Sequence, residues 1–157
     1  METIYSTSAT IEKLAVEADL VIGAVLIRGD KAPKLISNSL VSKMKPGSVL
    51  VDIAIDQGGC FEDSQATTHA QPTFPVHNTL FYCVANMPGA VPRTSTLALT
   101  NATLPYLLLL ANHGWQRAIS QNDSLRAGLS THNGSLYCPE VGHALGIQAR
   151  DTDELVG

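Results

Sequence analysis

Three groups of residues, each placed directly after an apolar run of the sequence, have the types and spacing of a ligand site. They are Val25-Leu26-Ile27, Asp56-Gln57-Gly58-Gly59 and Asn86-Met87-Pro88-Gly89. If the apolar runs are parallel strands, their carboxyl ends meet at one edge of a sheet, where open α/β sheets bind their ligands. A carboxylate at that edge can orient a substrate or move a proton, and an amide can hold a carbonyl or carboxamide group.

Asp56 is the titratable residue among these groups. The apolar run before it is expected to desolvate its carboxylate, and the two glycines after Gln57 let a ligand approach the backbone closely. The alternative interpretation is a plain turn, because Asp and Gly dominate turns for backbone reasons, and the tetrapeptide by itself favours that alternative. Asp52 lies four residues earlier, on the same face of a continuing strand. It is predicted to hydrogen-bond neighbouring backbone.

The hydrophobic pattern indicates which elements carry these groups. Residues 10–56 alternate between apolar residues at helical spacing and continuous β-branched runs, and a third apolar run covers 80–85. Such runs, separated by helical segments, are typical of a parallel sheet with helices on both faces, so we expect an α/β fold. The segment that contains Pro72 and Pro75 is predicted to be a loop.

The pattern becomes helical from Val91 onward, and we place a domain boundary there. Residues 94–112 are predicted to form one long apolar helix with a kink at Pro105 and an end at Gly114. Its predicted buried face consists of Leu97, Leu104, Leu107, Leu108 and Ala111.

Turn signals organise the last part of the chain. Asn133-Gly134 predicts a tight turn between two short extended segments. Pro139 and Gly146 are expected to begin and end a short helix. The tail 151–157 is expected to fray.

Composition and charge exclude several classes of partner. Fourteen acidic residues against ten Lys and Arg give a net charge of -4 without a basic cluster, which argues against nucleic acid. The longest purely apolar stretch, 107–111, is far shorter than the ~20 residues of a membrane span, and the first residues do not resemble a signal peptide. We therefore expect a cytoplasmic protein. With 45% hydrophobic and 15% charged residues, the chain is expected to have surface that other protein covers.

Motifs for metals and pyrophosphates are absent from the sequence. The five histidines are scattered and are interpreted as surface or capping residues, and the three cysteines lack C-x-x-C spacing and are interpreted as buried thiols. No metal site is predicted. Neither G-x-G-x-x-G nor G-x-x-x-x-G-K-[ST] occurs, so a nucleotide site in this chain would be half a site.

Several segments, taken together, closely resemble the carboxyl-terminal part of NAD-dependent alanine dehydrogenases. The resemblance rests on the strand tips and on the run from Asp52 to Gly59, and it covers nearly the whole chain. The matching segments are 19–26, 44–62, 82–89, 94–96, 99–106 and 113–115. The resemblance implies the second half of a Rossmann-type parallel sheet, followed by a helical carboxyl-terminal segment.

The resemblance also implies a domain organisation and a reaction. Residues 1–91 would be a partial NAD-binding domain, and residues 92–157 would be helices that return to a substrate domain. The main body of that domain, with the family's catalytic His and substrate-binding Lys, and the Gly-rich half of the cofactor site would lie outside this sequence. The implied reaction is the reversible oxidative deamination of L-alanine to pyruvate and ammonium, with NAD as the cofactor that carries the hydride.

The same resemblance implies the site residues. Asp56 matches the family's active-site aspartate beside the nicotinamide and the bound amino acid, which replaces the turn interpretation with a catalytic role. Ser6 aligns with a serine near the adenosine end of the cofactor. The strand-tip residues expected to contact NAD are Val25, Leu26, Ile53, Ala54, Ile55, Asp56, Val84, Ala85, Asn86 and Met87.

The sequence departs from the family pattern at two positions. Leu109 stands one helical turn before His113, where some members have a metal-binding Glu, and Gln65 stands where some members have a cofactor-contacting Arg. The first departure agrees with the prediction of no metal site.

Two alternatives to an alanine dehydrogenase remain open. One is the soluble part of a nicotinamide nucleotide transhydrogenase, although Asp56 favours the dehydrogenase because that relative tends to have Glu. The other is a non-enzymatic remnant or one piece of a split subunit. We expect the chain alone to be inactive and to need a complementing amino-terminal fragment, in a homo-oligomer that is a hexamer in the family.

Overall fold

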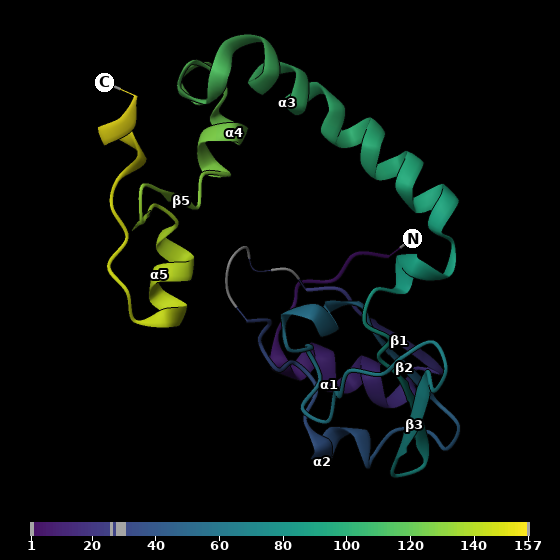
Figure 1. Ribbon diagram of the computed structural model, residues 1–157. Coiled ribbons are helices and arrows are strands. Elements are labelled where there is room, and N and C mark those ends of the chain that lie inside the picture. The colour runs from purple at the N-terminus through teal and green to yellow at the C-terminus, as the bar shows by residue number, and fades with distance from the viewer. Residues whose placement is uncertain (1, 26, 28–30, 157) are drawn as a thin grey trace. The chain divides into compact units, whose positions relative to one another are not determined.

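The computed structural model describes residues 2–25, 27 and 31–156 of the chain. Contacts within the chain divide the described residues into two compact units, with the boundary between Ala90 and Val91 (Figure 1). The first unit contains the strand tips and the second contains the long helix. The assignment of 1–91 and 92–157 as pieces of two domains of an enzyme stays a prediction.

The first unit is built on a four-stranded sheet in the order β1-β2-β4-β3. Strands β1 (Leu20–Gly23), β2 (Val49–Asp52) and β4 (Thr79–Tyr82) are parallel, as the β-branched runs predicted. Strand β3 (Thr73–Val76) pairs antiparallel with β4 at the edge, so the prediction of a loop there is wrong. Pro75 lies inside β3, and proline is tolerated in an edge strand because one side of that strand needs no backbone donor.

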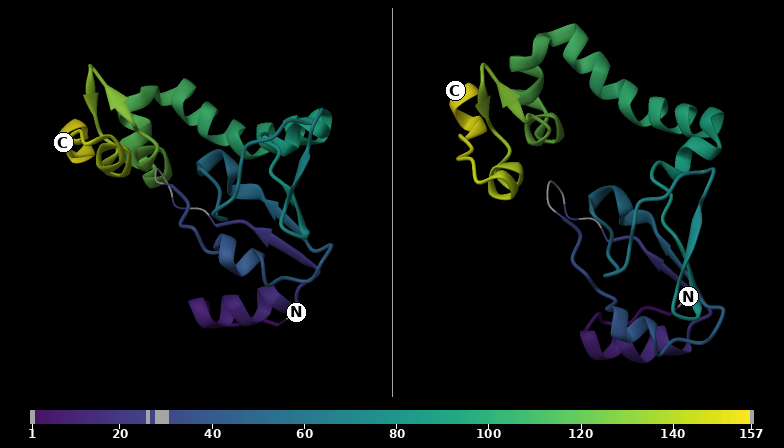
Figure 2. Two further views of the ribbon diagram at one scale, coloured as in Figure 1. Left: turned by 90° about the horizontal axis from the view of Figure 1, so that it is seen from below. Right: turned by 60° about the horizontal axis from the view of Figure 1, so that its bottom comes forward.

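Two helices pack on the sheet. Helix α1 (Ser8–Glu17) begins at a capping box, in which Thr7 and Thr10 exchange hydrogen bonds between side chain and backbone. The short helix α2 (Asn38–Val41) begins at Ser37, whose hydroxyl accepts the N–H of Leu40. The two helices lie side by side in Figure 2 and contact each other directly.

The core lies on the face of the sheet that these helices cover. Leu50 and Phe81 are fully buried there, and the Phe61 ring packs edge-on against Phe81 with ring centroids 5.9 Å apart. On the opposite face Leu20 and Ile22 are more than half exposed. Helices on both faces were predicted, but the described residues cover one face, and the other contributes to the apolar surface that the composition indicated.

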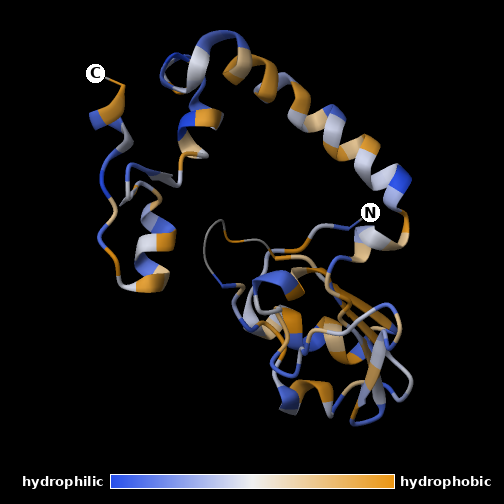
Figure 3. Ribbon diagram, in the orientation of Figure 1, coloured by the Kyte–Doolittle hydropathy of each residue, from blue (hydrophilic) through white to orange (hydrophobic). Residues whose placement is uncertain are grey.

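In the second unit the helix α3 (Pro92–Gln121) consists of two helical stretches that meet at a kink. Pro105 lies within it, but the backbone breaks at Gly114, which has a φ of +72°. The first helical stretch therefore ends at Gly114, as predicted, because glycine adopts this left-handed conformation without steric cost. The predicted buried face is exposed: Leu97, Leu104, Leu107, Leu108 and Ala111 all lie at the surface, and Figure 3 shows apolar residues along the helix.

Length and composition alone would allow helix α3 to cross a membrane, since its mean hydropathy over an 18-residue window is 1.2. None of that window is buried within the described structure. Threonine and asparagine side chains interrupt the apolar surface of the helix at Thr100, Asn101, Thr103 and Asn112. The helix therefore presents a mixed surface, apolar enough to be covered by protein.

The rest of the second unit follows the predicted turn signals. After α4 (Asp123–Ala127), strands β5 (Thr131–His132) and β6 (Ser135–Leu136) form a hairpin whose turn residues Asn133 and Gly134 both have positive φ. Helix α5 (Pro139–Leu145) ends at Gly146 in the left-handed conformation, as predicted. The tail is not frayed, because a 3₁₀ turn η3 (Thr152–Leu155) forms there.

Candidate functional site

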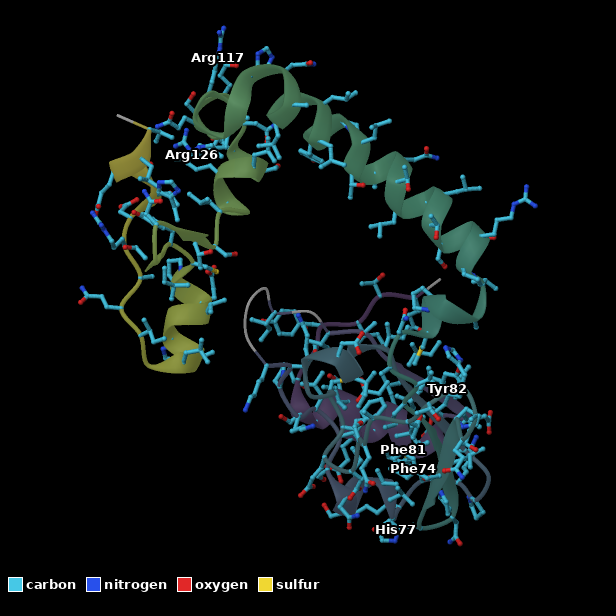
Figure 4. The ribbon with its side chains drawn as sticks, viewed as in Figure 1. Phe74, His77, Phe81, Tyr82, Arg117 and Arg126 are labelled. Atoms are coloured by element: carbon cyan, nitrogen blue, oxygen red, sulfur yellow. The ribbon has the colours of Figure 1, made fainter. Side chains whose placement is uncertain are left out.

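The carboxyl ends of β1, β2 and β4 lie at one edge of the sheet. Gly23 is the register partner of Asp52, and Val51 is the partner of Tyr82, so the residues after the three strands emerge next to one another. In Figure 4, Tyr82 marks this edge on β4, and His77 marks the turn at the opposite end of the strand. We call the residues 24, 25, 27, 53–59 and 83–90 the tip edge.

Asp56 lies in a 3₁₀ turn η1 (Ile53–Gln57) and not on an extended strand. The predicted strand 49–55 ends early, at Asp52, and the turn closes at Gly58, whose φ of +87° is favourable only for glycine. The Asp56 side chain is exposed, so the prediction that the apolar run desolvates it is wrong. It also does not share a strand face with Asp52, because the chain changes from strand to turn between them.

Asp52 is fully buried and forms hydrogen bonds with the loop that follows the turn η1. Its carboxylate accepts the N–H of Cys60 at 2.9 Å and of Phe61 at 3.4 Å, and the hydroxyl of Ser64 at 2.5 Å. The prediction that Asp52 hydrogen-bonds neighbouring backbone is confirmed. Gly59 packs so closely that a Cβ there would lie 2.7 Å from the Asp52 carboxylate. This packing is one reason why glycine follows the turn.

A second segment, 31–36, is hydrogen-bonded to the same loop. The N–H of Ala32 donates to the carbonyl of Gln57 at 3.1 Å, and the N–H of Leu35 donates to the carbonyl of Cys60 at 2.8 Å. The Lys34 ammonium donates to the carbonyls of three loop residues, Gly58, Gly59 and Phe61. Lys34 was not predicted from the sequence, because its partners are 24 to 27 residues away and no local pattern connects them.

Gln57 ties the 3₁₀ turn to the tip of β1. Its side-chain N–H donates to the carbonyl of Ile27 at 3.3 Å, while its Oε1 atom is buried without a hydrogen-bond partner in the described part of the chain. The contact brings the first and second tips together. Val25, a predicted cofactor residue at the first tip, is partly buried against the core, and Leu26 lies outside the described residues.

The third tip is held in an unusual backbone conformation. Asn86 has a φ of +58°, and its carbonyl accepts the N–H of Gly89 at 2.9 Å as the chain enters the 3₁₀ turn η2 (Met87–Ala90). The His69 ring Nε2 lies 3.2 Å from the same carbonyl and serves as a donor to it. Asparagine is among the few non-glycine residues that adopt positive φ at low cost. The Asn86 side chain is exposed at the edge.

The predicted cofactor residues differ in what they offer at the tip edge. Ile53, Asp56 and Asn86 expose their side chains, and Ala85 and Met87 are half-buried. Ala54, Ile55 and Val84 are buried, so contact with a ligand would be through their backbone. Ser6 is exposed on the extended segment before α1, and in the described structure it has no hydrogen bond to the tips.

Cys60 and Cys83 lie behind the tip edge and are free and buried, as predicted. Burial raises the pKa of the Cys60 thiol from 9.0 to about 11, and the charge of Asp52 and its hydrogen bond to the thiol add to the rise. Burial also raises the pKa of Cys83. Since thiolates are the reactive form, both residues are packing residues and not nucleophiles.

The second unit contains a cavity of about 410 Å³, lined in part by Arg126, Tyr137 and Arg150. Both guanidinium groups are paired with carboxylates: Arg126 with Asp123 and Asp153, and Arg150 with Glu154. The cationic charge of this cavity is therefore already compensated. No group of three or more metal-ligating side chains occurs among the described residues.

Comparison with known proteins identifies the family of the chain. The family model for the alanine dehydrogenase/PNT C-terminal domain matches residues 1–139. The chain belongs to this family. Alanine dehydrogenases of Mycolicibacterium smegmatis and Mycobacterium tuberculosis are 60% and 63% identical to it over 99% and 94% of its length. The resemblance found in the sequence is thereby confirmed, and the family's enzymes are NAD-dependent oxidoreductases.

Solved structures confirm the α/β fold with its following helical segment. An L-alanine dehydrogenase matches 90% of the chain, and 39% of that structure, with a TM-score of 0.74 and 50% identity. A transhydrogenase from Sinorhizobium meliloti matches 57% of the chain, and 25% of its own, with a TM-score of 0.52 and 30% identity. The chain spans 42% and 40% of the lengths of the two mycobacterial relatives, so the matched region is a part of each.

Proposed function

We propose that this chain supplies one half of the NAD site and the aspartate of an alanine dehydrogenase, which converts L-alanine, NAD⁺ and water to pyruvate, ammonium, NADH and a proton. The observation that carries the proposal is the exposed Asp56 carboxylate at the tip edge, in a chain that is 60% identical over 99% of its length to the alanine dehydrogenase of Mycolicibacterium smegmatis. In open α/β sheets this edge binds the ligand.

The residues at the edge fit a nicotinamide cofactor. Ile53 offers exposed apolar surface for a flat ring, and the exposed Asn86 amide can pair with a carboxamide. The buried Ala54 and Val84 offer backbone groups close by. NAD, when bound, supplies the hydride acceptor, and the residues of the chain orient it and exclude water. In this proposal Ser6 contacts the adenosine end.

Asp56 has two tasks in this mechanism. Its negative charge attracts the α-ammonium group of alanine and stabilises the positive charge of the protonated imine that forms when the α-carbon is oxidised. Its carboxylate can also take a proton from the water that then attacks the imine carbon and releases ammonium. An exposed carboxylate on a short turn can reach a substrate that enters from outside the sheet.

The test is the Asp56→Asn variant of a complete enzyme that carries this segment. Asparagine keeps the shape but loses the charge and the basic oxygen, so kcat should fall by about 10²- to 10⁴-fold. Asp19→Asn is the matched control, because Asp19 is an exposed carboxylate whose described ion pair is with Lys45 at 3.2 Å. Near-normal turnover of Asp56→Asn would refute the catalytic role.

A second test concerns the chain alone. We propose that it does not form NADH from alanine by itself, because it lacks a Gly-rich pyrophosphate turn. An NADH-formation assay with and without an amino-terminal fragment of the enzyme checks this. Turnover by the chain alone would contradict the dependence on that fragment.

The proposal also includes the setting of the enzyme. We propose a cytoplasmic homo-oligomer, in which protein covers the apolar residues exposed on helix α3 and on the open face of the sheet, such as Leu107 and Ile22. Light scattering of the complete enzyme tests the assembly, and a monomer would contradict it. A transhydrogenase is the weaker alternative, because the match to that structure covers 57% of the chain at 30% identity.

A further inference from the structure

Lys34 makes a set of contacts that is unusual for a surface lysine. Its ammonium donates to the carbonyls of Gly58 at 2.6 Å, Gly59 at 2.9 Å and Phe61 at 2.9 Å. An ammonium group has three hydrogens, and each has its own acceptor here. All three acceptors belong to the loop that directly follows Asp56.

Asp52 also forms hydrogen bonds with this loop. There the buried carboxylate accepts the N–H groups of Cys60 and Phe61. Phe61 therefore donates its N–H to the Asp52 carboxylate and accepts a hydrogen bond from the Lys34 ammonium at its carbonyl. This arrangement fixes the backbone from Gly58 to Phe61 in one conformation, although two glycines in it would otherwise allow many.

Asp56 itself has no such support. In the described structure its exposed carboxylate has no hydrogen bond, and the turn that carries it is closed through Gly58, whose N–H donates to Ile55 at 3.0 Å. The direction of the carboxylate therefore depends on the backbone immediately after it. Lys34 holds the carbonyl of Gly58, two residues from Asp56.

We propose that Lys34 is a positioning residue, which clamps the loop 58–61 and thereby aims the Asp56 carboxylate at the substrate. The inference rests on the proposed function of Asp56. Lys34 contacts backbone carbonyls and not the reacting atoms, so its effect reaches the reaction through Asp56. A misplacement of about 1 Å at a reacting group can cost on the order of 100-fold in rate.

The fold is expected to survive the loss of the clamp. The lysine side chain is exposed, and the backbone bonds of Ala32 and Leu35 to the loop remain, as do those of Asp52. Lys34→Met keeps the length and the apolar stem of the side chain and removes all three donors. Lys13→Met on helix α1 is the matched control, because Lys13 is also an exposed lysine of the same unit.

The experiment uses a complete enzyme that carries this segment. In Lys34→Met, kcat for alanine oxidation should fall about 10- to 100-fold while the KM for NAD stays within about threefold. In the double variant with Asp56→Asn, Lys34→Met should lower kcat by less than about a further threefold, because the carboxylate that Lys34 positions is absent. Lys13→Met should change none of these values. If Lys34→Met does not fold, Lys34→Gln takes its place with the same expected pattern.

Two kinetic results would overturn the proposal. One is a kcat of Lys34→Met within about twofold of the unsubstituted enzyme, and the other is an equal fold-loss of kcat from Lys34→Met with or without the Asp56→Asn substitution. Hydrogen exchange gives a readout independent of activity: the amides of 58–61 should exchange at least about tenfold faster in Lys34→Met, and unchanged exchange would also refute the clamp. If the unsubstituted enzyme does not oxidise alanine, the proposed function fails alone, and exchange still decides on the clamp.

Discussion

Asp52→Asn and Asp52→Ala should differ widely in stability, because the two oxygens of the Asp52 carboxylate accept unequal sets of hydrogen bonds. Oδ2 accepts the N–H of Cys60 at 2.9 Å, the N–H of Phe61 at 3.4 Å and the hydroxyl of Ser64 at 2.5 Å. Oδ1 accepts the Cys60 thiol, a weak donor, at 3.5 Å. An asparagine can place its single carbonyl oxygen at the Oδ2 position and keep the three stronger bonds. An alanine keeps none of them.

The expected losses follow from this geometry. In Asp52→Asn three bonds to a charged acceptor become bonds to a neutral one and weaken, but burying an amide is less costly than burying a carboxylate, so the net loss is about 1 kcal/mol. In Asp52→Ala the N–H groups of Cys60 and Phe61 are left buried and unpaired at about 1–3 kcal/mol each. The free energy of unfolding should therefore fall by about 4 kcal/mol.

Urea unfolding followed by circular dichroism measures both losses, with all variants at one protein concentration. Asp19→Ala is the control, because its carboxylate is exposed and surface charges of this kind contribute less than about 1 kcal/mol. If Asp52→Asn lowered the free energy of unfolding as much as Asp52→Ala, the proposal that the two oxygens contribute unequally would be wrong. If Asp52→Ala lost less than about 1 kcal/mol, the buried network would not stabilise the loop.

Two further predictions concern the packing behind the tip edge. Because the pKa of Cys60 rises from 9.0 to about 11 on folding, the unfolded chain loses this proton first, and the free energy of unfolding should fall by about 1 kcal/mol per pH unit between pH 9 and 11. Urea midpoints across this range check the slope of the free energy of unfolding against pH. Cys60→Ala should reduce this slope, and an unchanged slope in that variant would contradict the prediction. Gly23→Ala should destabilise the protein by about 1–3 kcal/mol, because its Cβ would overlap the Cys60 sulfur and lie 2.7 Å from the Phe61 ring. A thermal melt measures this, and a variant as stable as the parent would refute the close packing.

Local patterns in the sequence were sufficient where an element depends on neighbouring residues. The hairpin at Asn133-Gly134 was predicted from two residues, because positive φ at both positions is a local steric requirement. The parallel strands were predicted from their β-branched runs for the same kind of reason. Strand β3 was missed because Pro75 lowers its local strand propensity, while its pairing with β4 depends on a partner strand.

The candidate site divides in the same way. The sequence by itself determined that Asp56 and Asn86, each in a glycine-containing turn, follow two of the three apolar runs, and it carried the family resemblance. The tertiary structure decided that Asp52 is buried as an anchor and Asp56 exposed on a turn, and that Lys34 reaches the carbonyls beside it. The physical reason is separation along the chain: turn and strand preferences act between neighbours, whereas burial and hydrogen-bond pairing depend on residues that only folding brings together.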